Sequence, residues 1–465
     1  MLEASRGRRW AFLALIPFLL GGTPRPAAQQ PSKPVRLAQA ASLAPAPVRR
    51  ELPPPSPRAR KLRQLGDRLG THAVPLENPC VARSGTTCTR TALAPFFESL
   101  DTLSAGKASS PAVISAFGNS LIAGDRIVDI VREELAGTFG DGGRGVLFVD
   151  RLAPYGPRSR AGYARGTWEP RTIGEVKLAE LPFGVAGVYH MATSARASSR
   201  FALSGEPRGT LWWLDVPRAG PLSVQVDGKE LARTEPQGDG QARSLAFELP
   251  EGARTLDVVA ESRGAVVLGV VLQHQRPGTV LDTLGVPSAD ANLFLRARED
   301  LFRAQLAERS PRLLLFILGG NEAKRLEWGR SKLHEVEDGL RSFVRRARTA
   351  APDSACLVMG PIDAVRGGNG PSRLVQRPYL DEVITVERRI ALAEGCAFFD
   401  AYTAMGGKGS LERFDKAGMM HEDLVHPKGH GLDLLGQLLT DALLREWVDS
   451  GAPRQAALQA SEESR

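Results

Sequence analysis

Four side chains in three short segments of the chain are of the types needed to hydrolyse an ester. Ser120 lies in AFGNSLIAGD, Asn321 lies in LFILGGNEA, and Asp423 and His426 lie in EDLVHPKGH. A serine hydroxyl can attack a carbonyl when a histidine takes its proton, a carboxylate orients that histidine and an amide stabilises the oxyanion. The set predicts a serine esterase with Ser120 as nucleophile and His426 as general base. Asp423 is expected to orient His426, and Asn321 to donate to the oxyanion.

Each of these residues also has a purely structural interpretation when it is taken alone. Ser120 can cap the helix that follows it, and Asn321 can cap a turn. His421 and His430 flank the same loop as His426, but neither has an Asp three residues before it and a Pro after it. His430 is expected to open the last helix instead. Only the combination of the three segments favours catalysis over capping.

The elements that must position these side chains alternate between strand and helix. Apolar runs predict strands at 112–117, 280–284, 312–318, 356–360 and 396–400, and helical periodicity predicts helices at 126–139, 290–306, 333–349, 380–393 and 431–447. This alternation predicts an α/β fold, with a five-stranded parallel sheet covered by helices. Sites in such folds lie at the carboxyl ends of strands, where all three segments fall.

A region with a different sequence pattern interrupts the core between its first and second strands. Short β-rich runs alternate there with Gly/Pro turns, at 209–216, 222–226, 244–249, 255–261 and 265–273. They predict an inserted β-sandwich or jelly-roll. Trp213 or Trp168 is a candidate platform for a sugar ring. Adjacent strand residues point to opposite faces, so at least one of Trp212 and Trp213 is expected in the core.

The beginning of the chain has the pattern of an export signal. Arg6, Arg8 and Arg9 precede an apolar run at 10–20, which is too short to favour a membrane span, and small residues follow. An uncleaved anchor is the alternative. The predicted parts are a signal peptide (1–28), a disordered Pro/Ala/Arg-rich linker (29–62), a lead-in with the first part of the core (63–145), the β insert (146–276), the rest of the core (277–450) and a disordered tail (451–465).

Composition limits the partners and the compartment. The chain has 465 residues and a net charge of +8, but much of the excess lies near the N-terminus, so no nucleic-acid partner is expected. This basic segment is either a solvated linker or a weak contact for an anionic envelope surface. Four cysteines in an exported chain favour pairing. Cys80 and Cys88 are expected to clip a small loop, whereas Cys356 and Cys396 either bridge two neighbouring strands or remain buried thiols.

The order Ser, Asn, Asp-x-x-His resembles that of the SGNH hydrolases, also called the GDSL esterase family. The segments FGDGGRGVLF and FFDAYTAMGG, with a β module inside the core, resemble the branch of exported peptidoglycan O-acetylesterases and O-acetyltransferases. In that branch the inserted β domain resembles a carbohydrate-binding module. The resemblance implies a flavodoxin-like three-layer core, and deacetylation or acetyl transfer on a cell-envelope glycan. No cofactor is expected, and no metal, because no segment of the sequence has metal-ligand spacing.

The resemblance also implies further oxyanion donors and shows where this chain departs from the family. Many relatives have a Gly-x-x-Gly-like turn after the second strand, where this chain reads Gly285 and Ser288. We expect the backbone N–H groups of Ser120 and Ser288, together with Gly285, to contribute to the oxyanion hole, in preference to a competing turn at 184–187. Asn119 replaces the usual Asp before the serine, and Leu121 replaces a His that often follows it.

The sequence therefore predicts a periplasmic or secreted serine esterase that removes O-acetyl groups from an acetylated polysaccharide such as peptidoglycan. Two alternatives stay open. The same residues suit an O-acetyltransferase on that glycan class, in which a sugar hydroxyl replaces water. The three departures from the family pattern also suit a catalytically degenerate glycan-binding protein.

Overall fold

The structure is a computed structural model that describes residues 50–152, 161–165, 168–175, 180–367 and 374–451. The expected signal peptide, the linker up to residue 49 and the tail beyond residue 451 lie outside these ranges. Within the described ranges, no helix is both long and apolar enough to cross a membrane. The same ranges contain no cluster of three or more His, Cys, Asp or Glu side chains able to hold a metal ion.

The core is a five-stranded parallel sheet. Its strands lie in the order β15 (Thr279–Gly285), β3 (Ala112–Gly118), β16 (Leu313–Ile317), β17 (Ala355–Met359) and β20 (Ala397–Phe399). Because β3 is first in the chain, the spatial order is 2-1-3-4-5, the flavodoxin-like order. The predicted α/β fold and the five-stranded sheet are confirmed.

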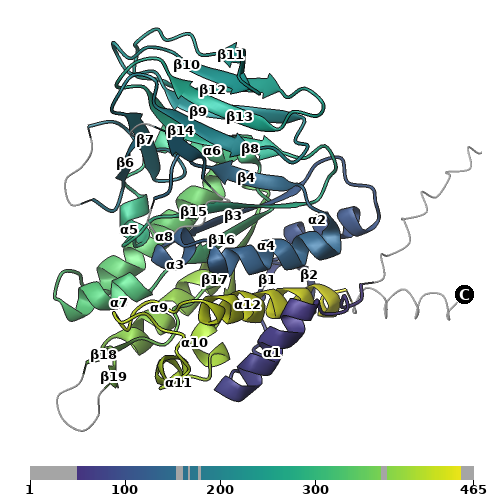
Figure 1. Cartoon of the computed structure of the whole chain (residues 1–465). Coiled ribbons are helices and arrows are strands. Elements are labelled where there is room, and N and C mark those ends of the chain that lie inside the picture. The colour runs from purple at the N-terminus through teal and green to yellow at the C-terminus, as the bar shows by residue number, and fades with distance from the viewer. Residues whose placement is uncertain (1–49, 153–160, 166–167, 176–179, 368–373, 452–465) are drawn as a thin grey trace, which may run out of the picture. The chain divides into compact units, whose positions relative to one another are not determined.

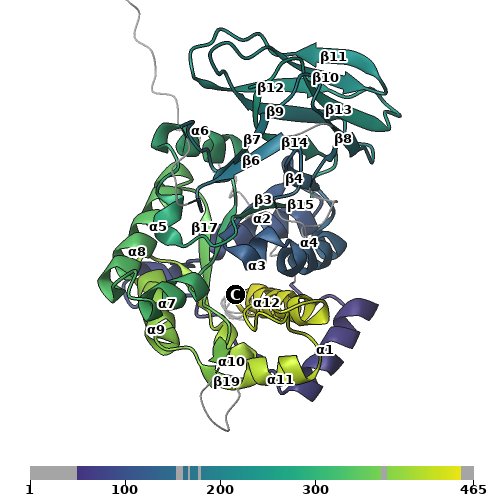
Figure 2. The same ribbon diagram turned by 60° about the vertical axis from the view of Figure 1, so that its left-hand side comes forward.

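Helices cover both faces of this sheet (Figures 1 and 2). They are α1 (Pro57–Leu69), α2 (Ala94–Ser104), α3 (Ser120–Ala123), α4 (Arg126–Phe139), α5 (Ala291–Phe294), α6 (Glu299–Arg309), α7 (Gly320–Glu327), α8 (Leu333–Ala350), α9 (Leu380–Ala393), α10 (Ala401–Ala404), α11 (Ser410–Lys416) and α12 (His430–Asp449). Both views place α4 and α12 side by side on one face, and α5 and α8 on the other.

The alternation of side chains along each strand divides the core into two apolar clusters. Leu314 and Phe316 of β16 pack on one face with Phe343 of α8, whereas Leu315 and Ile317 pack on the other face with residues of α4 and α12. Successive residues of a strand point to opposite faces, so a continuous apolar run such as LLLFI must be covered on both sides. This is why the strands lie in the middle layer.

Two predictions need correction, one of a continuous helix and one of a disordered segment. The helix expected over 290–306 is broken into α5 and α6, because Arg346 of α8 donates to the carbonyls of Leu295 and Ala297, at 3.1 and 2.6 Å. A continuous helix would bond such carbonyls internally.

The expected disordered linker is wrong from residue 57 onward, where α1 begins with Ser56 as its cap and Pro57 in its first turn.

The inserted module consists of two antiparallel sheets. One has the order β11-β10-β13-β8-β5, and the other has the order β12-β9-β14-β7-β6 with β4 also paired to β14. The strands are β4 (Gly143–Leu147), β5 (Tyr163–Arg165), β6 (Trp168–Thr172), β7 (Val188–Ala192), β8 (Ser198–Ala202), β9 (Arg208–Leu214), β10 (Leu222–Val226), β11 (Lys229–Arg233), β12 (Ala242–Glu248), β13 (Thr255–Ala260) and β14 (Val266–Gln273). Since β4 starts at Gly143, the sheet begins a few residues before the predicted boundary at 146.

The tryptophans proposed as sugar platforms are buried. Trp168 and Trp213 are each 5% exposed and belong to the apolar cluster between the two sheets. Trp212 points to the opposite side, where its indole N–H donates to Glu308 of α6 at 2.9 Å. Trp212 and Trp213 are both in the core, where at least one of them was predicted to lie. Because Trp168 and Trp213 are both buried, neither presents a face to a sugar.

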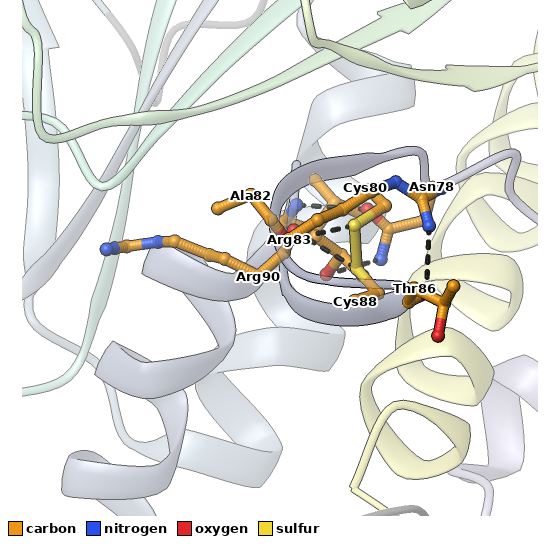
Figure 3. Close-up of a disulfide and its surroundings, with 9 residues drawn as sticks. Asn78, Cys80, Ala82, Arg83, Thr86, Cys88 and Arg90 are labelled. Carbon is orange, nitrogen blue, oxygen red and sulfur yellow. Dashed lines mark hydrogen bonds between the residues drawn. A yellow bond between two sulfur atoms is a disulfide. The ribbon is translucent and has the colours of Figure 1, made fainter.

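Both cysteine pairs are disulfides. Cys80 and Cys88 join β1 (Cys80–Ser84) to β2 (Thr87–Thr91) in a short hairpin (Figure 3), as predicted. Cys356 of β17 bonds Cys396, which lies next to β20. The strands are neighbours, so the bridging alternative holds and the free-thiol alternative is wrong. One further hairpin, β18 (Val365–Gly367) with β19 (Leu374–Gln376), lies between β17 and α9.

Candidate active site

Ser120 lies where β3 passes into α3. Asn119 is the N-cap of that short helix, and its side-chain oxygen accepts a hydrogen bond from the Leu121 N–H at 3.0 Å. An amide oxygen can cap a helix as a carboxylate does. The replacement of Asp by Asn at this position therefore keeps the cap, and with it the turn that presents Ser120.

The proposed triad is assembled. Ser120 Oγ lies 2.7 Å from His426 Nε2, and His426 Nδ1 lies 2.6 Å from Asp423 Oδ2. With the Nδ1 proton directed at the carboxylate, Nε2 is left to accept the serine proton. The geometry is that of a nucleophile, a base and an orienting carboxylate in one hydrogen-bonded chain.

Asp423 is held in its charged form. Burial by itself favours the neutral acid, but hydrogen bonds from the His426 ring and from the N–H groups of Val425 and His426 outweigh burial and lower its pKa to about 2. A carboxylate that stays ionised can stabilise the imidazolium formed during attack. The loop itself turns sharply at Leu424, whose φ of 53° is unusual for a residue with a side chain.

The two rival histidines take other positions. His430 opens α12, as predicted, and its Nδ1 lies 3.0 Å from Asp433 Oδ2. His421 pairs through its backbone N–H with the carbonyl of His426, so it fixes the loop. Within the described residues neither ring forms a hydrogen bond with Ser120, whereas the His426 ring does, so His426 is the candidate base.

Asn321 lies in the first turn of α7 and lines a cavity together with Ser120. Its Nδ2 donates to the carbonyl of Ala289 at 2.7 Å, which fixes the orientation of the amide. Asn321, Ser120 and His426 line one common cavity. Among the described residues, the backbone N–H of Ser120 has no hydrogen-bond partner. One Asn321 amide hydrogen and the Ser120 N–H are thus available for an oxyanion.

The turn after β15 contains the remaining expected donor. Ser288 has a φ of 64°, the left-handed conformation that favours glycine, and its N–H is also without a partner in the described part of the chain. It lines neither cavity at Ser120 and is linked to the site through Ala289 and Asn321. A serine here therefore keeps the backbone shape of the usual glycine, so Ser288 remains the candidate third donor.

Gly285 and the competing turn at 184–187 do not have the positions of donors. A Cβ at Gly285 would lie 2.4 Å from the Ala123 nitrogen, so this glycine allows β15 to pack against α3, and it lines a different cavity. In the competing turn, Val185 N–H bonds Gln305 of α6 at 2.9 Å. We correct the expectation for Gly285: close packing, not donation, explains the glycine.

Ser120 and His426 lie between two cavities. A cavity of about 500 Å³ is lined by both residues together with His421, Glu422 and Lys428. The cavity shared with Asn321 has a volume of only about 50 Å³. Apolar side chains such as Leu121 and Ile362 line it together with the charged residues Lys324, Asp363 and Arg377. The larger cavity has the size and the polar lining of a ligand site, and the smaller one admits a group of a few heavy atoms.

Sequence reasoning missed the residues that support the oxyanion side. Glu322 is 4% exposed and accepts hydrogen bonds from Gly319 N–H at 2.8 Å and from Ala291 N–H at 3.2 Å. Arg325 Nε lies 2.8 Å from Asp290 Oδ2. The available signal was the helical spacing of Asn321, Glu322 and Arg325 after a strand, but α7 is too short and polar for its periodicity to be detected.

The chain is also similar in sequence to a known family of hydrolases. Residues 251–434 match the model of the GDSL-like lipase/acylhydrolase family. This span contains Asn321, Asp423 and His426 but not Ser120, which the structure places against them. This part of the chain is thus similar to the GDSL-like lipases/acylhydrolases, and the assembled Ser120–His426–Asp423 chain of hydrogen bonds is the arrangement of a carboxylic ester hydrolase. No curated protein matches the sequence closely enough to count as a relative.

One solved structure supports the fold. A peptidoglycan O-acetylesterase superposes with a TM-score of 0.64 at 23% identity, covering 77% of this chain and 96% of its own. Weaker matches are a Bacillus subtilis protein (TM-score 0.31, 13% identity, covering 60% of this chain and 88% of its own) and an acetylxylan esterase from Geobacillus stearothermophilus (TM-score 0.26, 20% identity, covering 37% and 73%). Scores as low as the last two do not establish a shared fold.

Proposed function

We propose that this GDSL-like hydrolase removes O-acetyl groups from a cell-envelope polysaccharide, with peptidoglycan as the first candidate. The observation that carries the proposal is the pairing of Ser120 and His426 between a small and a large cavity. The peptidoglycan O-acetylesterase with the same fold supports the choice of glycan.

In the proposed reaction Ser120 attacks the acetyl carbonyl while His426 takes its proton. The oxyanion receives hydrogen bonds from the Ser120 N–H, the Asn321 amide and the Ser288 N–H. Collapse of the intermediate expels the sugar hydroxyl, protonated by His426, and leaves an acetyl ester on Ser120. Water, deprotonated by His426, then releases acetate and restores the serine.

The cavity volumes support a proposal for where the two halves of the ester bind. A volume of about 50 Å³ holds a few water-sized groups, so the small cavity suits an acetyl group and excludes a long acyl chain. The larger cavity, with His421, Glu422 and Lys428 on its wall, offers polar partners for the hydroxyls of a sugar. We therefore propose a preference for acetyl over longer acyl esters.

Export to the periplasm or the exterior is part of the proposal. Two disulfides are typical of proteins that function outside the reducing cytosol, and the N-terminal sequence has the pattern of a signal peptide. Such a location would bring the enzyme to its envelope substrate.

The test is release of acetate from O-acetylated peptidoglycan sacculi, with sacculi de-O-acetylated by mild base as control. The proposal expects acetate from the first sample only, and none with Ser120→Ala. Absence of acetate from sacculi, together with release from acetylated xylan, would contradict the peptidoglycan assignment. Transfer of acetyl to an added sugar acceptor in place of release would contradict hydrolysis and favour the transferase.

A further inference from the structure

The turn that follows β15 is held in an unfavourable backbone conformation. Ser288 has a φ of 64°, and a residue with a Cβ disfavours the left-handed region that glycine adopts freely. The Ser288 side chain is exposed and donates no hydrogen bond recorded among the described residues that would stabilise this shape. The surroundings of the turn must therefore supply the stabilisation.

Helix α7 supplies it through three side chains. Asn321 donates to the carbonyl of Ala289 at 2.7 Å, and Glu322 accepts from the N–H of Ala291 at 3.2 Å. Arg325, one turn further along the helix, also reaches the turn. Because α7 carries the Asn321 oxyanion donor, these contacts fix two parts of the oxyanion site relative to each other.

Arg325 holds both ends of the strained segment. Its Nη2 donates to the carbonyl of Ser288 at 3.3 Å, and its Nε lies 2.8 Å from Asp290 Oδ2. Asp290 is itself buried and caps α5 through the Leu293 N–H at 2.9 Å. The guanidinium thus connects the strained peptide to a fixed anchor, and its planar fork suits two contacts in different directions.

We infer that Arg325 is a positioning residue, which keeps the Ser288 turn in the conformation that aims its N–H and orients the Asn321 amide. The inference rests on ester hydrolysis at Ser120, and not on which glycan is the natural substrate. It also gives a reason why a residue with a side chain can occupy this left-handed position: the arginine compensates for the unfavourable backbone of Ser288.

Substitutions of Arg325 and Ser288 are expected to depend on each other. Arg325→Met keeps the length and apolar stem of the side chain but removes both polar contacts. If the arginine acts by holding a strained serine, its loss must matter less when position 288 needs no such support. The effect of Arg325→Met should therefore shrink in a Ser288→Gly background, a coupling that a double-mutant cycle measures.

The experiment uses the full chain and p-nitrophenyl acetate, a substrate that does not depend on the identity of the glycan. With Ser288 present, Arg325→Met is expected to lower kcat by about tenfold to a hundredfold with little change in KM, since loss of a whole oxyanion donor costs about 10²–10³-fold. In the Ser288→Gly background the same substitution is expected to lower kcat by less than about threefold.

Arg389→Met is the matched control. It removes a surface arginine that bonds Glu337 through two nitrogens at 2.9 and 2.7 Å, away from the Ser288 turn, and it should leave kcat unchanged. Thermal unfolding of each variant distinguishes loss of the folded state from loss of the correct position of the Ser288 N–H and the Asn321 amide. An unchanged kcat in Arg325→Met, or an equal loss in both backgrounds, would overturn the inference. Failure to release acetate from sacculi would instead overturn only the proposed substrate.

Discussion

Asn321 has two amide hydrogens, and within the described residues only one of them has an acceptor, the carbonyl of Ala289. The other is free to stabilise charge that develops on a substrate oxygen. A donor that is already oriented costs no reorganisation when the charge appears, which is why preorganised donors contribute strongly to catalysis. In the proposed reaction the amide is thus both an oxyanion donor and a link to the neighbouring turn.

Asn321→Ala is therefore expected to lower kcat for p-nitrophenyl acetate by about 10²–10³-fold, with a much smaller effect on KM. Steady-state kinetics check this, with thermal unfolding to show that the variant is folded. A reduction carried by KM alone would mean that Asn321 contacts the ground state, against the role proposed here.

In the proposed reaction Asp423 acts through His426 and not on the substrate. Asp423→Asn keeps the size of the side chain but cannot hold the ring in the tautomer that leaves Nε2 unprotonated, so kcat should fall by about 10³–10⁴-fold. Because the pKa of Asp423 is about 2, its carboxylate is ionised at any pH above roughly 3, and protonation of Asp423 should not limit activity there. A variant with kcat within tenfold of the parent enzyme would contradict the orienting role.

The charged state of Asp423 also has a consequence for stability, and its sign follows from linkage. A depressed pKa in the folded state stabilises the protein above the unfolded pKa of about 3.9, and this contribution is lost as the pH falls toward 2. The stability difference between the parent enzyme and Asp423→Asn should accordingly disappear in acid.

At the scale of elements, α7 and α9 face each other with two buried carboxyls. Burial, and then the nearby carboxyl of Glu322, raise the pKa of Glu387 well above its ordinary value. Burial, and then Asp290, raise the pKa of Glu322 to about 7. Glu322 accepts two backbone N–H groups, whereas Glu387 Oε2 has no partner in the described part of the chain. Glu387 is therefore the carboxyl that keeps its proton.

This arrangement predicts a pH-dependent effect of Glu387→Gln. Glu387 stabilises the folded state below its unfolded pKa of about 4.3, and that contribution is lost as the pH rises toward the raised folded pKa. Glutamine has the shape of the neutral acid and does not titrate. The Tm of Glu387→Gln minus that of the parent enzyme should increase from about pH 5 to about pH 9, measured by calorimetry; a difference that is flat over this range would show that Glu387 is not protonated.

Elements with strong local patterns were predictable from the sequence. The helix expected over 380–393 has the bounds of α9, because its apolar positions recur at helical spacing, and the sheet strands are continuous apolar runs. The break between α5 and α6 was not predictable, since Arg346 of a later helix causes it. Helix α1 had detectable signals, Ser56 and Pro57 at its start and Gly70 at its end, but its charged composition concealed them.

The site shows the same division between local and tertiary information. Ser120 and Asn321 are recognisable because each lies in a distinctive short segment directly after a strand. Asp423 and His426 are recognisable from their spacing just before the last helix, although α10 and α11 separate their loop from β20, so the prediction that this segment also ends a strand was wrong. Arg325 has no such segment, and its role depends on where the Ser288 turn comes to lie. Gly285 resembled a donor in the sequence, yet only the packing of β15 against α3 shows that it is there to avoid a clash.

At the scale of the whole molecule, the Cys356–Cys396 disulfide closes a segment of 40 residues across neighbouring strands. By chain entropy such a loop stabilises the folded state by about 4 kcal/mol, compared with about 2.5 kcal/mol for the 8-residue separation of Cys80 and Cys88. Replacing Cys356 and Cys396 together by Ala should therefore reduce the free energy of unfolding in urea by more than the same replacement in the exposed hairpin. The reverse order would contradict this account of the two bonds.

The central claim for the whole molecule is that Ser120 forms the acyl-enzyme with His426 as its base. Hydrolysis of p-nitrophenyl acetate by the full chain and by Ser120→Ala tests it most directly. We predict that the parent enzyme shows a burst of p-nitrophenol followed by turnover, and that the variant shows neither while its Tm is unchanged. Equal hydrolysis by the folded variant would contradict the claim.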